Sequence, residues 1–161
     1  MKVITYEDKY FDDVASLLAD FRVTLRCFKG EITSPDIEDA KDELKQYLDE
    51  KFPLYIAINN DKAVGYVLLR VQGVVWVEHI FVSKDYRKMG VGSMLYEKAE
   101  EYSTNLGGDT MFNYVHPNND VMINFLKSKG YSVLNLIEIR KPFKGEKTKT
   151  KIEIGNNKFD Y

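Results

Sequence analysis

The sequence has little of several features that mark other classes of protein. It holds a single cysteine, Cys27, which excludes an internal disulfide and favours a reducing compartment. Its 23 basic and 25 acidic residues nearly balance, and without a basic excess we expect no nucleic-acid partner. No apolar run approaches the roughly 18 residues that a membrane-spanning helix needs, and the N-terminus lacks the apolar stretch of a signal peptide. We therefore expect a cytoplasmic protein with no membrane partner.

Histidine is also scarce, and the rest of the composition is that of a folded domain. The two histidines, His79 and His116, have no further ligands spaced around them, so we expect no metal site. The chain has 161 residues, of which 44% are hydrophobic, enough for one core. It shows no internal repeat, linker or low-complexity tract. We therefore expect a single domain over residues 1–161.

The spacing of apolar residues predicts a mixed α/β chain in the order β-α-α-β-β-β-α-β-α-β-β. The expected strands are Lys2–Tyr6, Leu54–Ile58, Ala63–Val71, Val74–Val82, Asp109–His116, Tyr131–Arg140 and Thr150–Ile154. The expected helices are one capped by Asp8, one begun by Ser34-Pro35, Ser93–Thr104 and Asn119–Ser128. The apolar segment 22–30, which carries three cations, is expected between the first two helices.

The most informative stretch joins the third strand of the central meander to the next helix. Its loop contains Gly90 and Gly92, which let the main chain approach an anion, and Arg87 and Lys88 add positive charge. The first N–H groups of a helix have no internal partners, and the helix dipole favours an anion there. This pattern indicates a pyrophosphate-binding turn. Leu95 stands where a dinucleotide fingerprint needs a third glycine, and the alternative is an ordinary strand–helix loop.

Two motifs of the chain resemble signatures of the GCN5-related N-acetyltransferases (GNAT). Arg87-x-x-Gly90-x-Gly92 resembles the family's Arg/Gln-x-x-Gly-x-Gly/Ala turn. Downstream, Asn119 opens a helix, Phe125 follows six residues later, and the segment closes with Gly130-Tyr131, as in the family's second signature. The element order agrees as well, and the resemblance is strongest over about residues 54–140.

The resemblance implies a single-domain α/β sandwich with a mixed, curved sheet of six to seven strands, flanked by about four helices. The cofactor-binding core would span about 54–140, and 141–161 would form a C-terminal hairpin or tail. The implied cofactor is acetyl-CoA. The implied activity is transfer of the acetyl group to a primary amine by direct attack in a ternary complex. The acceptor would be a small molecule or a peptide amine, namely a protein N-terminus or lysine.

The resemblance also implies which residues hold the cofactor. The main chain at the end of the strand before the turn would bind the pantetheine arm, the turn would bind the pyrophosphate, and two residues of the second motif would contact the arm. The residues for the pantetheine arm are Ile80, Phe81 and Val82 at the end of the strand, with Asn119 and Phe125 from the second motif. The residues for the pyrophosphate are those of the turn: Arg87, Lys88, Met89, Gly90, Val91, Gly92 and Ser93.

For catalysis, the resemblance favours a carboxylate on the strand before the turn as general base, and Glu78 is the candidate. Regular alternation would place Glu78 on the same face as Ile80 and Val82. The alternative is a carboxylate at the sheet surface, paired with a neighbouring lysine. Leu126 stands where many members carry a tyrosine that protonates the thiolate. We therefore consider Tyr114, Tyr131 or a water molecule as the general acid.

The acceptor side is less defined. The resemblance implies that the segment between the first two helices borders the acceptor, so Arg22 and Arg26 would bind an acidic acceptor, and His116 is a further candidate. Alternatively, the two arginines cap carbonyls or pair with the segment Asp39–Glu43.

Other readings of the chain stay open. Residues Ile152–Tyr161 offer a segment for pairing with a second copy, as a homodimer. Besides an enzyme, a non-catalytic acyl-CoA-binding sensor or regulatory module, or an enzyme that transfers a longer acyl chain, fits the same motifs.

Overall fold

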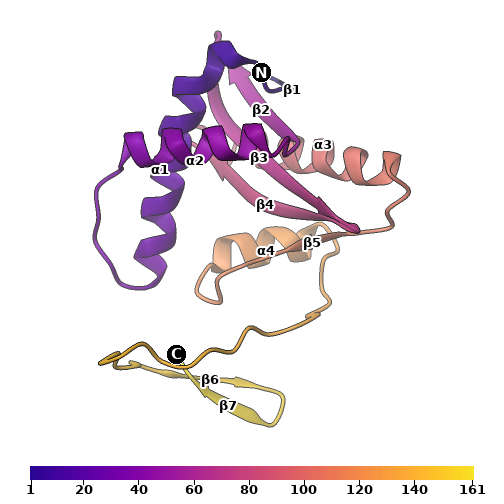
Figure 1. The fold of residues 1–161 in the computed structure, drawn as a ribbon. Helices are drawn as coiled ribbons and strands as arrows, with labels where there is room; N and C mark the ends of the chain where they lie inside the picture. The colour runs from indigo at the N-terminus through magenta and orange to yellow at the C-terminus, as the bar shows by residue number, and fades with distance from the viewer. The chain divides into compact units, whose positions relative to one another are not determined.

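The computed structural model describes residues 1–161, and Figure 1 shows its helices and strands. The strands are β1 (Lys2–Thr5), β2 (Leu54–Asn59), β3 (Lys62–Gln72), β4 (Val74–Val82), β5 (Met111–Asn113), β6 (Lys151–Ile154) and β7 (Asn157–Asp160). The helices are α1 (Phe11–Phe28), α2 (Ile37–Asp49), α3 (Val91–Asn105) and α4 (Asp120–Ser128). Short 3-10 turns, Asp8–Tyr10 and Lys84–Tyr86, precede α1 and follow β4. No helix combines the length and apolar character needed to cross a membrane.

The first five strands form one mixed sheet in the order β1-β2-β3-β4-β5. Neighbours pair antiparallel from β1 to β4, and β5 pairs with β4 in parallel. The long strands β2, β3 and β4 are rich in β-branched and aromatic residues, and β3 is buried from Ala63 to Leu69. The mixed α/β class expected from the sequence is confirmed.

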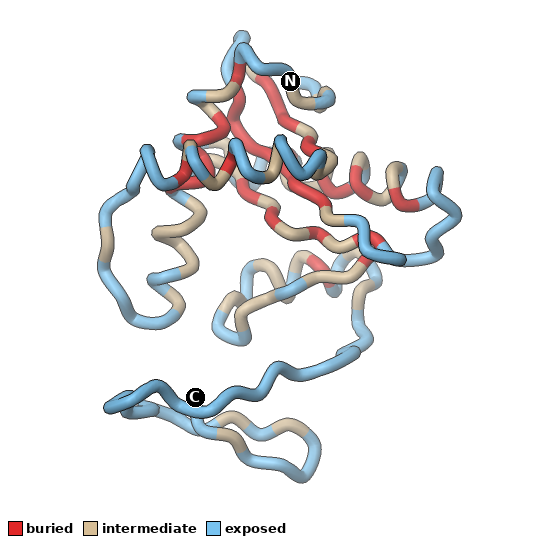
Figure 2. Tube along the Cα trace, viewed as in Figure 1, coloured by how far each residue is buried: buried red, intermediate tan, exposed pale blue.

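Helices cover both faces of this sheet. Apolar residues of α1 and α2, such as Leu18 and Leu44, form one core cluster with Tyr66 and Leu68 of β3. On the other face, a Cβ built on Gly65 would lie 3.2 Å from the side chain of Leu95 in α3. Figure 2 shows the buried residues concentrated along the central strands and on the inward sides of these helices.

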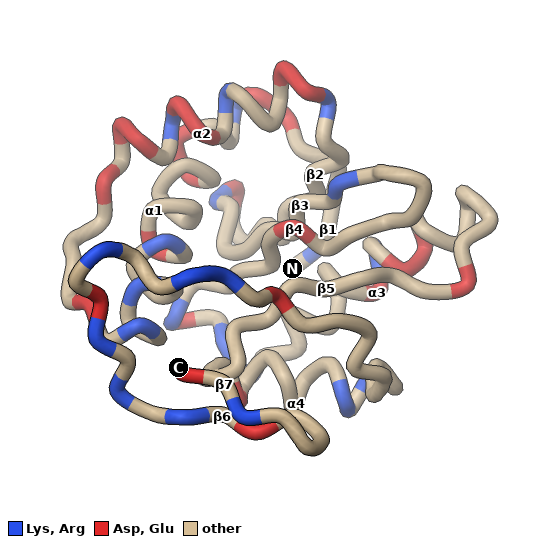
Figure 3. The backbone as a smooth tube through the Cα atoms, turned by 60° about the horizontal axis from the view of Figure 1, so that its bottom comes forward, with Lys and Arg blue, Asp and Glu red and all other residues tan.

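The chain divides by its contacts into two units, residues 1–125 and residues 126–161. In the second unit, β6 and β7 form a separate antiparallel two-stranded sheet. Instead of one sheet of six to seven strands, the seven strands are thus split between a sheet of five and a sheet of two. Lysines and arginines recur along residues 140–151 (Figure 3), as expected for a solvated tail. The expectation of a single domain stays a prediction.

Two expected strands differ from the structure. Residues 131–140 form no strand, although five apolar side chains recur there and are exposed: Val133, Leu134, Leu136, Ile137 and Ile139. The expected strand Asp109–His116 is reduced to the three residues of β5. Apolar, β-branched composition measures how well a segment suits a sheet, but a strand also needs a partner edge with matching register. Composition alone therefore predicted too much strand in both segments.

The starts of the first two helices also differ from expectation. Asp8 lies in the 3-10 turn before α1, and no side chain caps α1 itself. At α2 the capping residue is Asp36 rather than Ser34, and its carboxylate accepts a hydrogen bond of 3.0 Å from the Asp39 N–H. The segment 22–30, expected between the helices, continues α1 to Phe28.

Candidate functional site

The turn between β4 and α3 exposes main-chain N–H groups at a helix start. Lys88 and Gly90 both have left-handed backbone angles, with φ of 61° and 82°, and Gly90 is the N-terminal capping residue of α3. The first helical hydrogen bond of α3 runs from the Met94 N–H to the Gly90 carbonyl, at 3.0 Å. The N–H groups of Val91, Gly92 and Ser93 therefore precede the helical ladder, where an anion is stabilised by free donors and by the helix dipole.

Gly92 leaves space beside these donors. A Cβ built at this position meets only one side-chain atom, of Val82, at 4.0 Å. The neighbouring Arg87 and Lys88 are exposed, and the Arg87 Nε donates 3.0 Å to the Val82 carbonyl while its guanidinium lies 5.2 Å from the centre of the Phe81 ring. Arg87 thus ties the turn to the end of β4, with positive charge next to the helix start.

The end of β4 has an open edge, which we define as Glu78–Val82. The parallel pairing of β4 with β5 stops at Val77 opposite Asn113, so beyond Val77 the strand has no partner on that side. On the other side, the Ser83 N–H donates 2.9 Å to the Val64 carbonyl. Since hydrogen-bonded and non-hydrogen-bonded pairs alternate along an antiparallel ladder, the main-chain groups of Ile80 and Val82 point away from β3. The main-chain groups of Ile80 and the Val82 N–H can therefore bind a ligand along the open edge, while the Val82 carbonyl accepts from Arg87.

A bulge in β4 changes the face on which Glu78 lies. Leu68 is paired with His79 and the next residue, Leu69, with Val77, so Glu78 is an extra residue in β4. Directly paired residues share a face, and Leu68 and Arg70 alternate to the same face of β3. The expectation that Glu78 lies opposite His79 and Phe81 is therefore wrong: the bulge places it with them, on the face covered by α1 and α2.

Glu78 forms an ion pair with an arginine on the neighbouring strand. The Arg70 Nε donates 2.9 Å to one carboxylate oxygen of Glu78, and the Arg70 Nη1 donates 2.9 Å to the side chain of Gln72. The side chains of Arg70 and Glu78 are 23% and 25% exposed, so solvent still reaches the pair. The pairing expected for a sheet-surface carboxylate exists, but its partner is an arginine and not a lysine.

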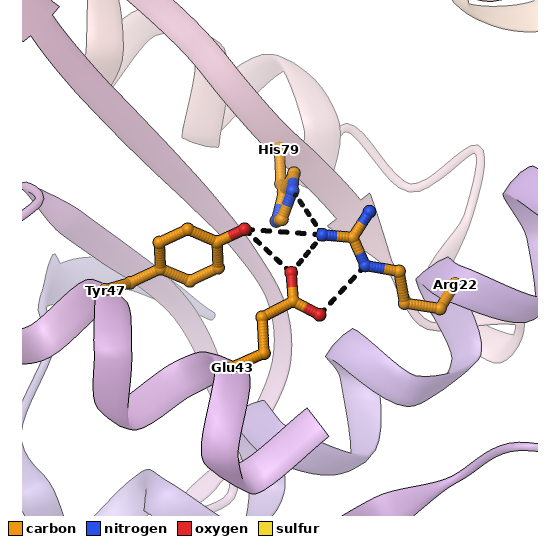
Figure 4. Close-up of polar contacts among 4 residues, drawn as sticks. All are labelled: Arg22, Glu43, Tyr47 and His79. Carbon is orange, nitrogen blue, oxygen red and sulfur yellow. Dashed lines mark hydrogen bonds and ion pairs between the residues drawn. The ribbon is translucent and has the colours of Figure 1, made fainter. Parts of the chain in front are cut away.

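A second polar cluster lies on the same face, deeper under α1 and α2 (Figure 4). The Arg22 guanidinium donates to both carboxylate oxygens of Glu43, with a 3.0 Å bond from its Nε, and the Tyr47 hydroxyl donates 2.7 Å to the same carboxylate. Burial alone would raise the pKa of Glu43, but the hydrogen bonds from Arg22 and Tyr47 outweigh it and hold that pKa below its usual range. Arg22 is thus paired with the segment Asp39–Glu43, the alternative left open from the sequence.

His79 completes this cluster as a neutral side chain. It is 5% exposed, and its Nε2 lies 3.1 Å from the Arg22 Nη2, which can only donate. The histidine therefore accepts at Nε2 and carries its proton on Nδ1, which is buried without a hydrogen-bond partner. Burial and the Arg22 cation lower the pKa of His79 from 6.5 to about 3.

The C-terminal end of α1 meets the loop before α4. The rings of Phe28 and His116 stack at 5.5 Å, and the Asn118 side chain donates 3.2 Å to the Phe28 carbonyl. Burial, and then the charge of Lys29, lower the pKa of His116. Arg26 lies exposed at the same end of α1.

The remaining predicted site residues fall in three places: at α4, after β5 and in the second unit. Asn119 accepts 3.1 Å from the Met122 N–H at the start of α4, and Phe125 packs edge-on against Tyr96 at 5.4 Å. Tyr114 follows β5, is 56% exposed, and stacks on Trp76 at 4.5 Å. Tyr131 belongs to the second unit, where its N–H donates 3.0 Å to the Leu126 carbonyl.

Two surface hollows lie away from these residues. One, of about 260 Å³, lies among residues that include Phe52, Pro53 and Tyr102. The other, of about 280 Å³, lies beside Met1 and the β2–β3 turn. Neither hollow contains the glycine turn or a charged cluster with buried donors, so the candidate site rests on the turn and the open edge.

Sequence reasoning missed several members of the site. Arg70, Trp76 and Tyr47 were not singled out, because their contacts join different elements. The polar residues at 70 and 78 within otherwise apolar strands were the available signal for the Arg70–Glu78 pair.

The chain is similar in sequence and in fold to known acetyltransferases. Residues 17–131 match the model of the acetyltransferase (GNAT) family. The aminoglycoside 6'-N-acetyltransferase AAC(6')-IG from Acinetobacter haemolyticus is 19% identical, with a TM-score of 0.66, over 89% of this chain and 99% of that one. A GNAT-family acetyltransferase from Staphylococcus aureus Mu50 is 20% identical, with a TM-score of 0.62, over 80% and 82%.

A further match is AAC(6')-Iy, solved with a bisubstrate analogue of coenzyme A and acetylneamine. It is 19% identical, with a TM-score of 0.66, over 88% of this chain and 98% of that one. The family match confirms the resemblance seen in the sequence, and the three structures share the fold.

Proposed function

Because the chain belongs to the acetyltransferase (GNAT) family, whose members transfer an acetyl group from acetyl-CoA to an amine, we propose that it acetylates a primary amine by direct attack in a ternary complex. The expected enzyme class, an acyl-CoA-dependent N-acyltransferase, and the expected cofactor, acetyl-CoA, follow from that membership. The proposal adds the roles of this chain's own residues.

The observation that carries the proposal is the start of α3. The N–H groups of Val91, Gly92 and Ser93 lie outside the helical ladder, and the left-handed Gly90 directs the chain into the helix. We assign the pyrophosphate of acetyl-CoA to these donors, with Arg87, Lys88 and Met89 completing the turn. The main chain of Ile80 and Val82 would hold the pantetheine arm, which is supported by the unpaired edge of β4; Phe81 lies between them with its main chain directed to β3. Asn119, just before α4, and Phe125, within α4, would line the same arm.

In the reaction, the amine nitrogen attacks the thioester carbonyl, a C–N bond forms, and the C–S bond breaks. The attacking amine must be neutral, and an alkylamine with a pKa near 10.4 is protonated at neutral pH. We assign Glu78 as the group that takes this proton, directly or through water. The bulge supports this role because it turns the carboxylate to the same face as His79, beside the open edge.

The leaving thiolate also needs a proton. Its pKa, near 8.5 for a thiol, is low enough for solvent to supply one. Tyr114 is the first side-chain candidate for this proton, since it follows β5 and stacks on Trp76, close to Glu78 in β4. Tyr131 is the alternative from the second unit.

We propose a cytoplasmic site of action and a homodimer as further parts of this function. The single cysteine, Cys27, is exposed and fits a reducing compartment. The two-stranded sheet β6–β7 has outer edges that pair with no other strand, so it offers edges to a second copy. Sedimentation of the purified protein would test the dimer: a monomer at micromolar concentration would remove that part.

Calorimetry with coenzyme A tests the cofactor site. Wild-type protein should bind coenzyme A, and Gly92→Leu should bind at least tenfold more weakly, because the new side chain fits the protein but occupies the space beside the donors. Thr104→Leu, at an exposed position near the opposite end of α3, is the matched control and should bind as wild type. No heat with wild type, or equal affinity for Gly92→Leu, would overturn the proposal.

Activity separates an enzyme from an acyl-CoA-binding sensor. Release of free coenzyme A thiol from acetyl-CoA should depend on added amine. Saturable cofactor binding without amine-dependent thiol release would favour the sensor.

A further inference from the structure

A group of aromatic side chains borders the open edge of β4. Trp76 stacks on Tyr114 with ring centres 4.5 Å apart and planes within 12°, and Trp76 also contacts Phe112 at 5.0 Å. The Arg70 guanidinium lies 5.8 Å from the Trp76 ring and 6.0 Å from the Tyr114 ring. We call Trp76, Phe112 and Tyr114 the aromatic platform. Its members are outside the core cluster, and Tyr114 is 56% exposed.

The platform lies on the same face of the sheet as Glu78 and next to it. Trp76 is paired with Arg70 on one side and with Phe112 on the other, so all three lie on one face of the sheet. The bulge brings Glu78 to that face, and the bond from Arg70 joins its carboxylate to the platform. An amine at Glu78 would therefore have a flat apolar surface next to it.

The charges of this face suit a single ammonium group. Two carboxylates on this face, Glu43 and Glu78, are each hydrogen-bonded to an arginine, Arg22 and Arg70. At the end of α1, Lys29 adds positive charge near His116, and Arg26 is exposed at the same end of the helix. A polycation would bring further ammonium groups to a site where these two carboxylates are already neutralised, and their burial without partners is costly.

We propose, resting on the proposed function, that the acceptor is a primary monoamine carrying an aryl group, whose ring packs on the aromatic platform while its nitrogen lies at Glu78. Stacking of aromatic rings supplies affinity beyond the burial of area, and Trp76 and Tyr114 present rigid rings at low entropic cost. In the transfer, the amine nitrogen bonds to the acetyl carbon, its proton leaves through Glu78, and coenzyme A departs as the thiol.

An acceptor panel tests this class. The probes are 2-phenylethylamine, n-hexylamine, spermidine and kanamycin, with kcat/KM measured by thiol release from acetyl-CoA. We expect 2-phenylethylamine to exceed n-hexylamine by about tenfold, the effect of one stacked ring, and to exceed both polycations by more. If n-hexylamine or either polycation matches or exceeds it, the proposed acceptor class is overturned while acetyl transfer stands. If no amine releases thiol from protein that binds coenzyme A, the proposed function itself fails.

Variants of the platform provide the second test. Trp76→Leu should raise KM for 2-phenylethylamine about tenfold and leave KM for n-hexylamine within about twofold, and Trp76→Phe should restore most of the loss because it keeps a ring. Tyr55→Leu is the matched control: Tyr55 also contacts a tyrosine, Tyr102, at 6.2 Å and a cation, Lys98, but lies away from Glu78. Equal changes of KM for both amines in Trp76→Leu would overturn the platform's role.

Discussion

Two arginine–glutamate pairs lie on the same face of the five-stranded sheet, in different surroundings. Arg22 and Glu43 join α1 to α2, and their cluster includes Tyr47 and the buried His79. Arg70 and Glu78 join β3 to β4 next to the open edge, beside exposed Tyr114. Both carboxylate oxygens of Glu43 accept hydrogen bonds within the protein, whereas Arg70 engages one carboxylate oxygen of Glu78, which lies at a bulge. From this comparison we expect the Arg22–Glu43 pair to stabilise the fold and the Arg70–Glu78 pair to take part in catalysis.

The largest effect that the comparison predicts is on catalysis. Glu78→Gln should lower kcat about 100-fold, because an amide cannot take a proton but still accepts a bond from Arg70. The same substitution in the other pair, Glu43→Gln, should leave kcat within about twofold. Thiol release at saturating amine measures both, and an equal loss in the two variants would contradict the division of roles.

The same two variants should reverse their order in stability. Glu43→Gln should lower the free energy of unfolding by about 2 kcal/mol, the range for a hydrogen bond to a charged group, because the carboxylate accepts from two nitrogens of Arg22 and from Tyr47, and an amide cannot keep all of these bonds. Glu78→Gln should change it by less than about 1 kcal/mol, since Glu78 accepts a single bond from Arg70, which the amide oxygen can keep. Urea unfolding of both variants checks this, and a larger loss for Glu78→Gln would remove the distinction.

The distinction was only partly predictable from the sequence. The strands around residues 54–82 were predicted within about one residue because β-branched residues and Asn/Gly turns mark them locally. The glycine turn was predictable for the same reason. The face of Glu78 was not, because a bulge adds one residue without altering the apolar alternation. The pairing of Arg22 with the segment Asp39–Glu43 was one of the alternatives that the sequence left open, and the packing of α1 on α2 selects Glu43 as the partner.

His79 gives the buried cluster a dependence on pH. In the unfolded chain a histidine binds a proton near pH 6.5, but burial and Arg22 lower the pKa of His79 to about 3. Below pH 6.5 the unfolded state therefore binds more protons than the native state, and stability is lost as the pH falls. Between pH 6 and 5 the loss should approach about 1.4 kcal/mol per pH unit. His79→Gln, which does not titrate, should have a shallower slope by that amount; parallel slopes would show that the histidine is not buried as a neutral group.

The smallest expected effect concerns the arginines themselves. Arg70 holds Glu78 through Nε and Gln72 through Nη1, a fork that a lysine ammonium cannot reproduce. Arg70→Lys should therefore lower kcat/KM about fivefold, equivalent to one hydrogen bond of about 1 kcal/mol, with little change in melting temperature. Arg22→Lys should lower the melting temperature further than Arg70→Lys does, because Arg22 bonds Glu43 and His79 inside the protein. If Arg70→Lys were the less stable variant and kept full activity, the Arg70–Glu78 pair would have a structural role. The orientation of Glu78 would then depend on the bulge alone.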